Sequence, residues 1–173
     1  MAGAYIHIPF CEHICYYCDF NKVFIEGQPV DDYVAMLLKE MRMVMAEHPD
    51  EKIETVYVGG GTPTTLTPKQ LAKLCQGIHD ILHFDSGEFT FEANPNDLLT
   101  TDKLQVLHDY GVNRLSIGVQ SFNDDVLKRI GRIHRAKDVY AAIANARKVG
   151  FDNLSIDLIF RLPDQNRDDF LNS

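Results

Sequence analysis

The chain has 173 residues, 45% of them hydrophobic, which is enough for one domain with a substantial apolar core. Its formal net charge of −8 argues against a nucleic-acid partner that is bound by neutralising phosphates. No apolar run approaches the length of a bilayer-spanning helix, and the N-terminus lacks the pattern of a secretion signal. We therefore expect a protein that is not transmembrane and that resides in the cytoplasm, where clustered thiols stay reduced.

The first predicted strand, residues 4–9, leads directly into a cysteine-rich loop. Cys11, Cys15 and Cys18 follow one another with the spacing C-x3-C-x2-C. Three cysteines in so short a run are typical of a metal or cluster site rather than of a disulfide framework. Thiolates are soft ligands, so zinc and an iron–sulfur cluster are the main candidates.

The residues alone leave the choice of metal open. A structural zinc site needs four protein ligands, so His7 or His13 would have to complete the set. An iron–sulfur cubane held by three cysteines instead keeps one iron free for a substrate or cofactor. The spacing differs from the usual C-x2-C zinc knuckle, which favours the cluster. Three thiols that bind nothing are the remaining alternative.

Strands and helices alternate through the rest of the chain. Helices are predicted at residues 31–47, opened by Asp31 or Asp32, then at 67–83, opened by Thr67, and at 100–111, 124–130, 137–149 and from 167 onwards; strands are predicted at 55–58, 88–92, 114–119 and 154–160. Because no hairpin signal separates the strands, we expect an α/β fold, a partial (β/α) barrel with about five parallel units whose strands are apolar on both faces. Cys75 falls on the apolar stripe of the second helix and is expected in the core.

Ligands of parallel α/β folds bind at the carboxyl ends of the strands. Besides the thiol loop, these ends carry the turn 59–62, which is Gly-Gly-Gly-Thr, and the polar residues Glu92, Gln120 and Asp157. The glycine turn lacks the residues of a Walker loop or of a dinucleotide fingerprint. A tight strand-to-helix turn and a ligand cradle are therefore equally supported.

The motif Y-I-H-I-P-F-C-x3-C-x-Y-C-D-F resembles the cluster loop of radical S-adenosylmethionine (radical SAM) proteins. It is similar in particular to the HemN/HemW group, which comprises oxygen-independent coproporphyrinogen III oxidases and haem chaperones. The resemblance implies a [4Fe–4S] cluster held by Cys11, Cys15 and Cys18, an open iron that binds SAM, and radical chemistry carried by these cofactors. It also implies an open (β/α)6 barrel and a C-terminal domain, so residues 1–173 would be a truncated radical SAM core that lacks the last barrel unit and that domain.

Further positions match the SAM site of this family. The G-G-G-T-P run implies contacts from Gly60, Gly61 and Thr62 to the methionine portion of SAM. Other contacts to SAM and two aromatic residues beside it are implied at Glu92, Gln120, Arg132, Asp157, Tyr5 and Tyr17. Without the resemblance, Arg132 would be interpreted as a solvated cation at a helix end, and the tyrosines as core or rim residues. His134 is expected to be structural.

Position 161 departs from the family pattern. The family commonly has Gly in the run F-G-L-P, whereas this chain has Arg161. If the site needs the conformational freedom or the small size of glycine, Arg161 would strain the backbone or fill the rim near Asp157. The resemblance is therefore weakest at the fifth strand.

Position 20 distinguishes the two branches of the HemN/HemW group. The oxidases carry a fourth cysteine there, in C-x3-C-x2-C-x-C, whereas this chain has Phe20. The resemblance therefore implies a haem chaperone that binds a [4Fe–4S] cluster and SAM and delivers haem to client proteins. Enzyme activity is left open, and no catalytic residue is assigned. The alternatives are an oxidase that acts on coproporphyrinogen III, a porphyrinogen, and a zinc-stabilised binding module.

Overall fold

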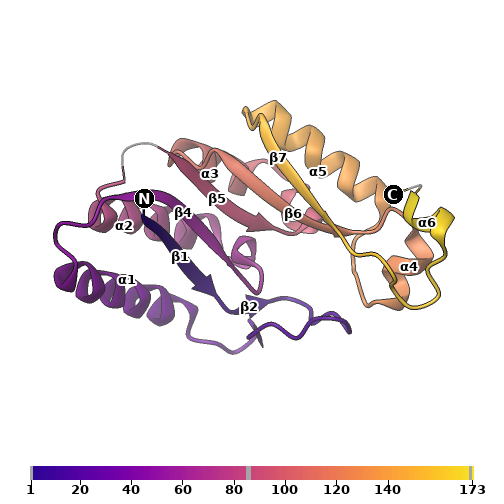
Figure 1. The fold of residues 1–173 in the computed structure, drawn as a ribbon, viewed down its shortest axis with the longest axis horizontal. Coiled ribbons are helices and arrows are strands. Elements are labelled where there is room, and N and C mark those ends of the chain that lie inside the picture. Colours follow the sequence, from indigo (N-terminus) through magenta and orange to yellow (C-terminus); the bar gives the residue numbers. More distant parts are fainter. Residues whose placement is uncertain (1, 85–86, 172) are drawn as a thin grey trace.

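The computed structural model describes residues 2–84, 87–171 and 173, and within them a five-stranded parallel sheet forms the frame of the fold (Figure 1). The strands lie side by side in chain order, each parallel to the next. They are β1 (Ala2–Ile8), β4 (Ile53–Gly60), β5 (Glu88–Ala93), β6 (Arg114–Gln120) and β7 (Asn153–Leu158). This order confirms the predicted partial (β/α) barrel, with small displacements of the predicted strand ends.

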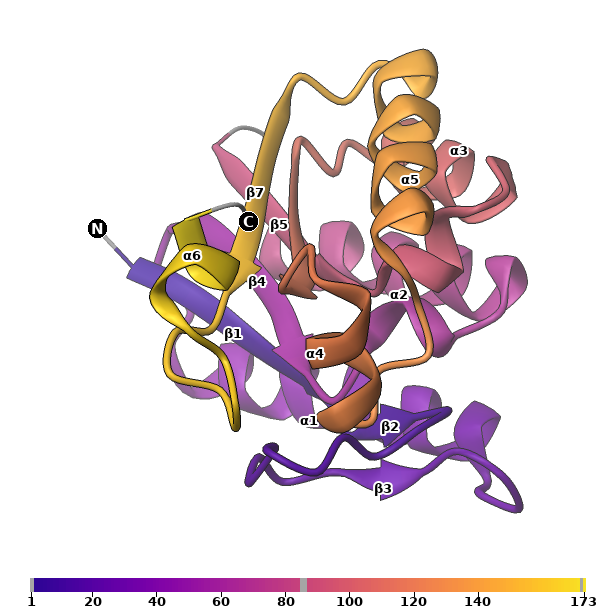
Figure 2. The ribbon, with the colours of Figure 1, turned by 90° about the vertical axis from the view of Figure 1, so that its right-hand side faces the viewer.

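Six α-helices of the described residues connect or follow the strands, and most of them cover one face of the sheet (Figure 2). They are α1 (Val30–Glu47), α2 (Pro68–Leu82), α3 (Asp102–Asp109), α4 (Asp124–Arg129), α5 (Ala136–Val149) and α6 (Arg167–Leu171). Contacts run from α1 to α2, from α2 to α3 and from α3 to α5, while α4 and α6 lie near the carboxyl ends of β6 and β7 (Figure 1). No helix in the described part of the chain is both long and apolar enough to cross a membrane.

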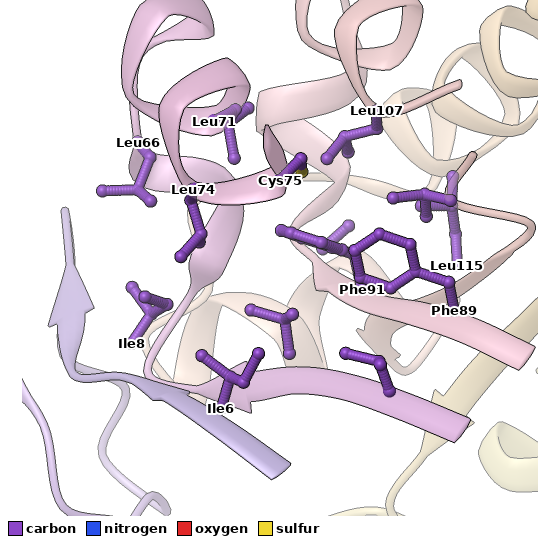
Figure 3. Close-up of a cluster of buried hydrophobic side chains, with 14 of the residues drawn as sticks. Ile6, Ile8, Leu66, Leu71, Leu74, Cys75, Phe89, Phe91, Leu107 and Leu115 are labelled. Carbon is purple, nitrogen blue, oxygen red and sulfur yellow. The ribbon is translucent and has the colours of Figure 1, made fainter. Parts of the chain in front are cut away.

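The hydrophobic core fills the space between the sheet and these helices. Figure 3 shows strand and helix side chains that meet there, among them Ile6, Ile8, Leu71, Leu74, Cys75, Phe89 and Phe91. Cys75 is fully buried, and burial raises the pKa of its thiol to about 12. The prediction that Cys75 is a core residue is thus confirmed.

The face of the sheet turned away from the helices is polar. Along β5, Phe89 and Phe91 belong to the core, whereas Thr90 and Glu92 alternate with them and lie on the other face. The prediction of strands that are apolar on both faces is therefore wrong. Its physical reason is that the helices α1, α2, α3 and α5 cover one face only, so the other face is free to line a polar cavity.

The predicted capping residues are found at the start of one helix but not of another. Thr67 and Gln70 form a capping box at the start of α2, in which each side chain binds the backbone N–H of the other residue. The predicted cap of α1 is wrong, because the helix begins before Asp31 and Asp32 and has no side-chain cap. Both acids lie in the first turn, where a negative charge favours the helix dipole.

Short elements around the cysteine-rich loop were not predicted. The strands β2 (Phe10–Cys11) and β3 (Val23–Phe24) pair in parallel and close the base of the loop. The 3₁₀ helices η1 (Pro63–Thr65) and η2 (Pro95–Leu98) follow β4 and β5. Elements of two to four residues are too short to show a hydrophobic period, so no sequence pattern indicates them.

Arg161, which stands where the family commonly has glycine, has a backbone conformation that favours glycine. Its φ is +61°, in the left-handed region that disfavours residues with a Cβ atom. The side chain is exposed and does not line the cavity described below. Arg161 therefore strains the backbone, as expected, but does not fill the rim near Asp157.

Replacing Arg161 by glycine should not destabilise the protein. Glycine avoids the cost of about 1–2 kcal/mol that a residue with a Cβ atom pays for a left-handed backbone conformation. It also lowers the stability by about 0.5–1 kcal/mol, because it gives the unfolded chain more conformational entropy. The free energy of unfolding of Arg161→Gly should therefore equal that of the wild type or exceed it by up to about 1.5 kcal/mol. Arg161→Val should be less stable than the wild type, because a branched Cβ tolerates this φ poorly. Urea unfolding measures both, and a valine variant as stable as the glycine variant would contradict the prediction.

Candidate functional site

A cavity of about 490 Å³ opens at the carboxyl ends of the strands. Its volume is typical of small-molecule binding sites. Every predicted site residue except Tyr5 lines it, namely Cys11, Cys15, Tyr17, Cys18, Gly60, Gly61, Thr62, Glu92, Gln120, Arg132 and Asp157. The fold thus brings together residues that are far apart in the sequence.

Three thiols of one loop line this cavity. Cys11 is buried at the end of β2, and its sulfur lies 3.5 Å from the Thr62 hydroxyl. Cys15 and Cys18 are partly exposed, and the Cys18 N–H donates to the Cys15 carbonyl at 3.2 Å. Burial raises the pKa of the Cys11 thiol, while the hydrogen bond with Thr62 acts in the opposite direction. All three cysteines are free, so the loop is available for ligation.

The rest of the loop is held by backbone contacts. The Tyr16 N–H donates to the Ile130 carbonyl at 3.1 Å, which ties the loop to the end of α4. The Lys22 ammonium donates to the carbonyls of Cys18 and Phe20. Phe20 lines the cavity and its side chain is largely exposed. The position that distinguishes the two branches therefore lies at the opening of the site.

His7 does not join the three thiols as a fourth metal ligand. Within residues 2–84, 87–171 and 173, no three His, Cys, Asp or Glu side chains are gathered closely enough to hold one metal ion. A structural zinc site requires four such ligands around a single point. His7, one candidate for the fourth ligand, bonds instead to the Tyr5 hydroxyl and the Asn21 carbonyl at 3.0 Å each. Three free thiols that line one cavity are a donor set of the kind that holds an iron–sulfur cluster.

The glycine turn packs closely against the thiol loop. The Thr62 N–H donates to the Phe10 carbonyl at 2.8 Å. A Cβ at Gly61 would lie 2.7 Å from the Phe10 oxygen, and a Cβ at Gly60, where φ is +120°, would lie 2.6 Å from the His7 ring. Glycine is thus required here by the approach of two chain segments. The same turn forms part of the cavity wall, so it is a packing contact and a possible ligand contact at once.

Four polar side chains from adjacent strands line the cavity, and we call Tyr57, Glu92, Ser116 and Asp157 the polar row. The Tyr57 hydroxyl donates to Glu92 Oε1 at 2.8 Å, and the Gly60 N–H donates to Glu92 Oε2 at 2.9 Å. The Ser116 hydroxyl donates to Asp157 Oδ2 at 3.1 Å. Each acid of the row is therefore held by a hydroxyl from the neighbouring strand.

Tyr57 and Ser116 were missed by the sequence analysis. Residues two apart in a strand lie on the same face of the sheet, and Tyr57 is two residues before Gly59. Ser116 stands on the face of Gln120 and pairs with Glu92 in the register of β5 and β6. The alternation of polar and apolar residues along the strands could have identified Tyr57 and Ser116. It was overlooked because the strands were expected to be apolar on both faces.

Arg132 lies in the cavity wall and is not a solvated cation at a helix end. Its Nη2 donates to Asn94 Oδ1 at 2.6 Å and to the Gly118 carbonyl, and its Nη1 lies 3.5 Å from the Cys15 sulfur. The buried Nε has no hydrogen-bond partner among the described residues. A guanidinium with a spare donor beside three thiols suits an anionic ligand.

The remaining predicted residues occupy different positions. Gln120 follows a register irregularity at the end of β6 and has a φ of +69°. Burial raises the pKa of Tyr17 well above its ordinary value, so its phenol stays protonated. Tyr5 is 61% exposed and stacks on Tyr57 with ring centroids 6.2 Å apart. Its contact with a cofactor stays a prediction.

His134 has the structural role expected of it. It is 1% exposed, and its Nε2 donates to the Val119 carbonyl at 3.0 Å. Among the described residues its buried Nδ1 has no partner. Burial, aided by the nearby Arg132 cation, lowers the pKa of His134 to about 4. The ring is therefore neutral near neutral pH.

Comparison with known proteins places these motifs in one family. The Radical SAM superfamily matches residues 5–173. The chain is 53% identical over 167 residues to the haem chaperone HemW of Bacillus subtilis (strain 168), which covers 95% of this chain and 44% of that protein. It is 36% identical over 168 residues to the oxygen-independent coproporphyrinogen III oxidase of Salmonella typhimurium, covering 96% of this chain and 36% of the oxidase.

A solved structure agrees with these sequence comparisons. The coproporphyrinogen III oxidase HemN from Escherichia coli, described as a radical SAM enzyme, superimposes with a TM-score of 0.90 and 33% identity. The match covers 98% of this chain and 39% of that one. The chain spans less than half the length of the relatives it matches.

Acidification should destabilise the cluster-free protein through His134. Its folded pKa of about 4 lies below the ordinary 6.5, so the unfolded chain binds the proton first and stability falls as the pH drops from about 6.5 towards 4. From about pH 7.5 to about pH 5 this group should remove about 2 kcal/mol from the free energy of unfolding. Urea unfolding of the wild type and of His134→Gln, which keeps a donor for Val119, measures the effect. Equal losses in the two proteins would contradict the assignment.

Proposed function

The chain belongs to the radical SAM superfamily, and we propose that it is the cofactor-binding core of a haem chaperone of the HemW type. The family implies a [4Fe–4S] cluster and SAM as cofactors. We assign the cluster to Cys11, Cys15 and Cys18. The main support is that three thiols, the glycine turn and two strand-end acids line one cavity.

The cavity wall offers a suitable group for each part of SAM. Gly60, Gly61 and Thr62 lie next to the thiol loop, where they would contact the methionine portion of SAM beside the cluster. Glu92 and Asp157 offer acceptors for ribose hydroxyls or for the amine. Arg132 lines the same cavity and offers its guanidinium to an anionic group beside the thiol loop. When bound, the two cofactors supply radical chemistry, and the protein supplies orientation and exclusion of side reactions.

Two observations favour a chaperone over an oxidase. Phe20 occupies the position where the resemblance to oxidases implies a fourth cysteine. The identity to the B. subtilis chaperone is 53%, against 36% to the Salmonella oxidase. We propose that the whole protein takes up haem and delivers it to haem-requiring clients in the cytoplasm.

Oxidative decarboxylation of coproporphyrinogen III is the second candidate, supported by the superposition on HemN with a TM-score of 0.90. Incubation of the reconstituted protein with coproporphyrinogen III, SAM and a reductant distinguishes the two functions. The chaperone proposal predicts that no protoporphyrinogen forms and that the whole protein binds haem. Formation of protoporphyrinogen at a catalytic rate would overturn it.

Substitution of Cys15 by serine should abolish assembly of the cluster. The loop lies outside the core, so the free energy of unfolding should change little. Anaerobic reconstitution followed by iron and sulfide analysis should give about four of each per wild-type chain, and far less for Cys15→Ser. Cys75→Ala is the matched control, because it removes a thiol from the core and should cost only about 1 kcal/mol of stability. Wild-type iron content in Cys15→Ser, or zinc in the purified wild type, would refute the ligand assignment.

A further inference from the structure

The two hydroxyls of the polar row have no role in the function proposed so far. We propose that Tyr57 and Ser116 are positioning residues that hold the carboxylates of Glu92 and Asp157 in the orientation needed to accept hydrogen bonds from SAM. The inference rests on the proposed function, since it concerns the same cavity. It adds two residues that do not themselves have to touch the cofactor.

The Glu92 side chain is fixed by β4 along its whole length. Tyr57 donates to one carboxylate oxygen at 2.8 Å, and the Gly60 N–H donates to the other at 2.9 Å. Gly59 lies beneath the carboxylate, because a Cβ built there would be 2.8 Å from Glu92 Cδ. A carboxylate oxygen accepts more than one hydrogen bond. Both oxygens therefore keep acceptor capacity for a ligand while their orientation is set by the protein.

Tyr57 is well placed to act as a permanent donor. Its ring stacks on Tyr5 with an interplanar angle of 23°. Burial and then the hydrogen bond to Glu92 raise the pKa of Tyr57 well above its ordinary value. The phenol therefore keeps its proton at any physiological pH. Its hydrogen bond to a charged acceptor is of the stronger class.

Ser116 performs the same task for Asp157. Asp157 is an exposed residue on β7, which is the outermost strand of the described sheet, so few neighbours restrict its side chain. Ser116 is 5% exposed, and its hydroxyl reaches Asp157 Oδ2 at 3.1 Å and Oδ1 at 3.4 Å. Ser116 also pairs with Glu92 in the sheet register. The two hydroxyls thus form two hydroxyl–acid pairs, which lie side by side on four adjacent strands.

The first test compares SAM binding by reconstituted variants of the chain. Tyr57→Phe removes the hydroxyl and keeps the ring, and we expect SAM to bind about tenfold more weakly, because a hydrogen bond to a charged group is lost. Ser116→Ala should weaken binding about threefold, since its bond is longer and Asp157 is more exposed. Tyr33→Phe is the matched control: it removes a phenol hydrogen bond of 2.8 Å to the His7 carbonyl, away from the cavity wall. Its SAM affinity should equal that of the wild type.

The second test separates positioning from a general structural role. If Tyr57 acts through Glu92, Tyr57→Phe should have no further effect on SAM affinity in the Glu92→Ala background. Ser116→Ala in the Asp157→Ala background forms an independent cycle with the same expectation. A tenfold loss that persists without Glu92 would show that Tyr57 acts on binding by another route, and would overturn its assignment.

The outcomes for this inference and for the proposed function are distinguishable. If the reconstituted wild type does not bind SAM, the proposed function fails, and the inference fails with it. If the wild type binds SAM and both Tyr57→Phe and Ser116→Ala bind it equally well, only the inference is overturned. Weaker binding that disappears in both double-mutant cycles supports the positioning role.

Discussion

The site depends on one close contact between the ends of β1 and β4. Gly61 and Thr62 donate backbone hydrogen bonds of 2.8 Å to carbonyls of the segment that leads into the thiol loop. No side chain beyond hydrogen fits at Gly60 or Gly61, because a Cβ there would overlap His7 or the backbone of residues 9 and 10. The contact fixes the first cysteine against Thr62, and it also aims the Gly60 N–H at Glu92. The backbone geometry of this contact therefore fixes the relative positions of the thiol loop, the glycine turn and Glu92. That geometry tolerates little variation.

The division of the sheet into an apolar and a polar face explains why a cavity exists at all. Helices α1, α2, α3 and α5 bury the apolar face, and the stability of the domain comes mainly from that side. The other face carries tyrosine, serine, glutamate and aspartate, which need partners if they are to be buried. Hydrogen bonds within the polar row partner some of these groups. The acceptor capacity that remains on the two carboxylates is available for a ligand. A fold with two apolar faces would have no such site.

The fold was predictable to a large extent, because five strands and six helices each left a local signal. The helix start at Thr67 and the alternation of strands and helices were both confirmed by the structure. The predicted site residues were also brought together, apart from Tyr5. Local signals did not contain the interactions between side chains that are far apart in the sequence. The bond from Tyr57 to Glu92 spans 35 positions, and Ser116 reaches Asp157 across 41. Such pairs depend on sheet register, which no single segment encodes.

Arg132 indicates how the cavity could accommodate a cluster held by thiolates although two acids line it. Its guanidinium bonds to the neutral oxygens of Asn94 and Gly118, and within the described residues it forms no ion pair. A partly buried cation without a counter-ion is costly. The nearest source of negative charge on its free side is the thiol loop, since Nη1 already lies 3.5 Å from the Cys15 sulfur. Thiolates that hold a cluster would place negative charge beside this cation. Glu92 and Asp157 accept hydrogen bonds from Tyr57 and Ser116, and neither acid forms an ion pair with Arg132 among the described residues. We therefore expect binding of the proposed cluster to lower the electrostatic cost of burying Arg132.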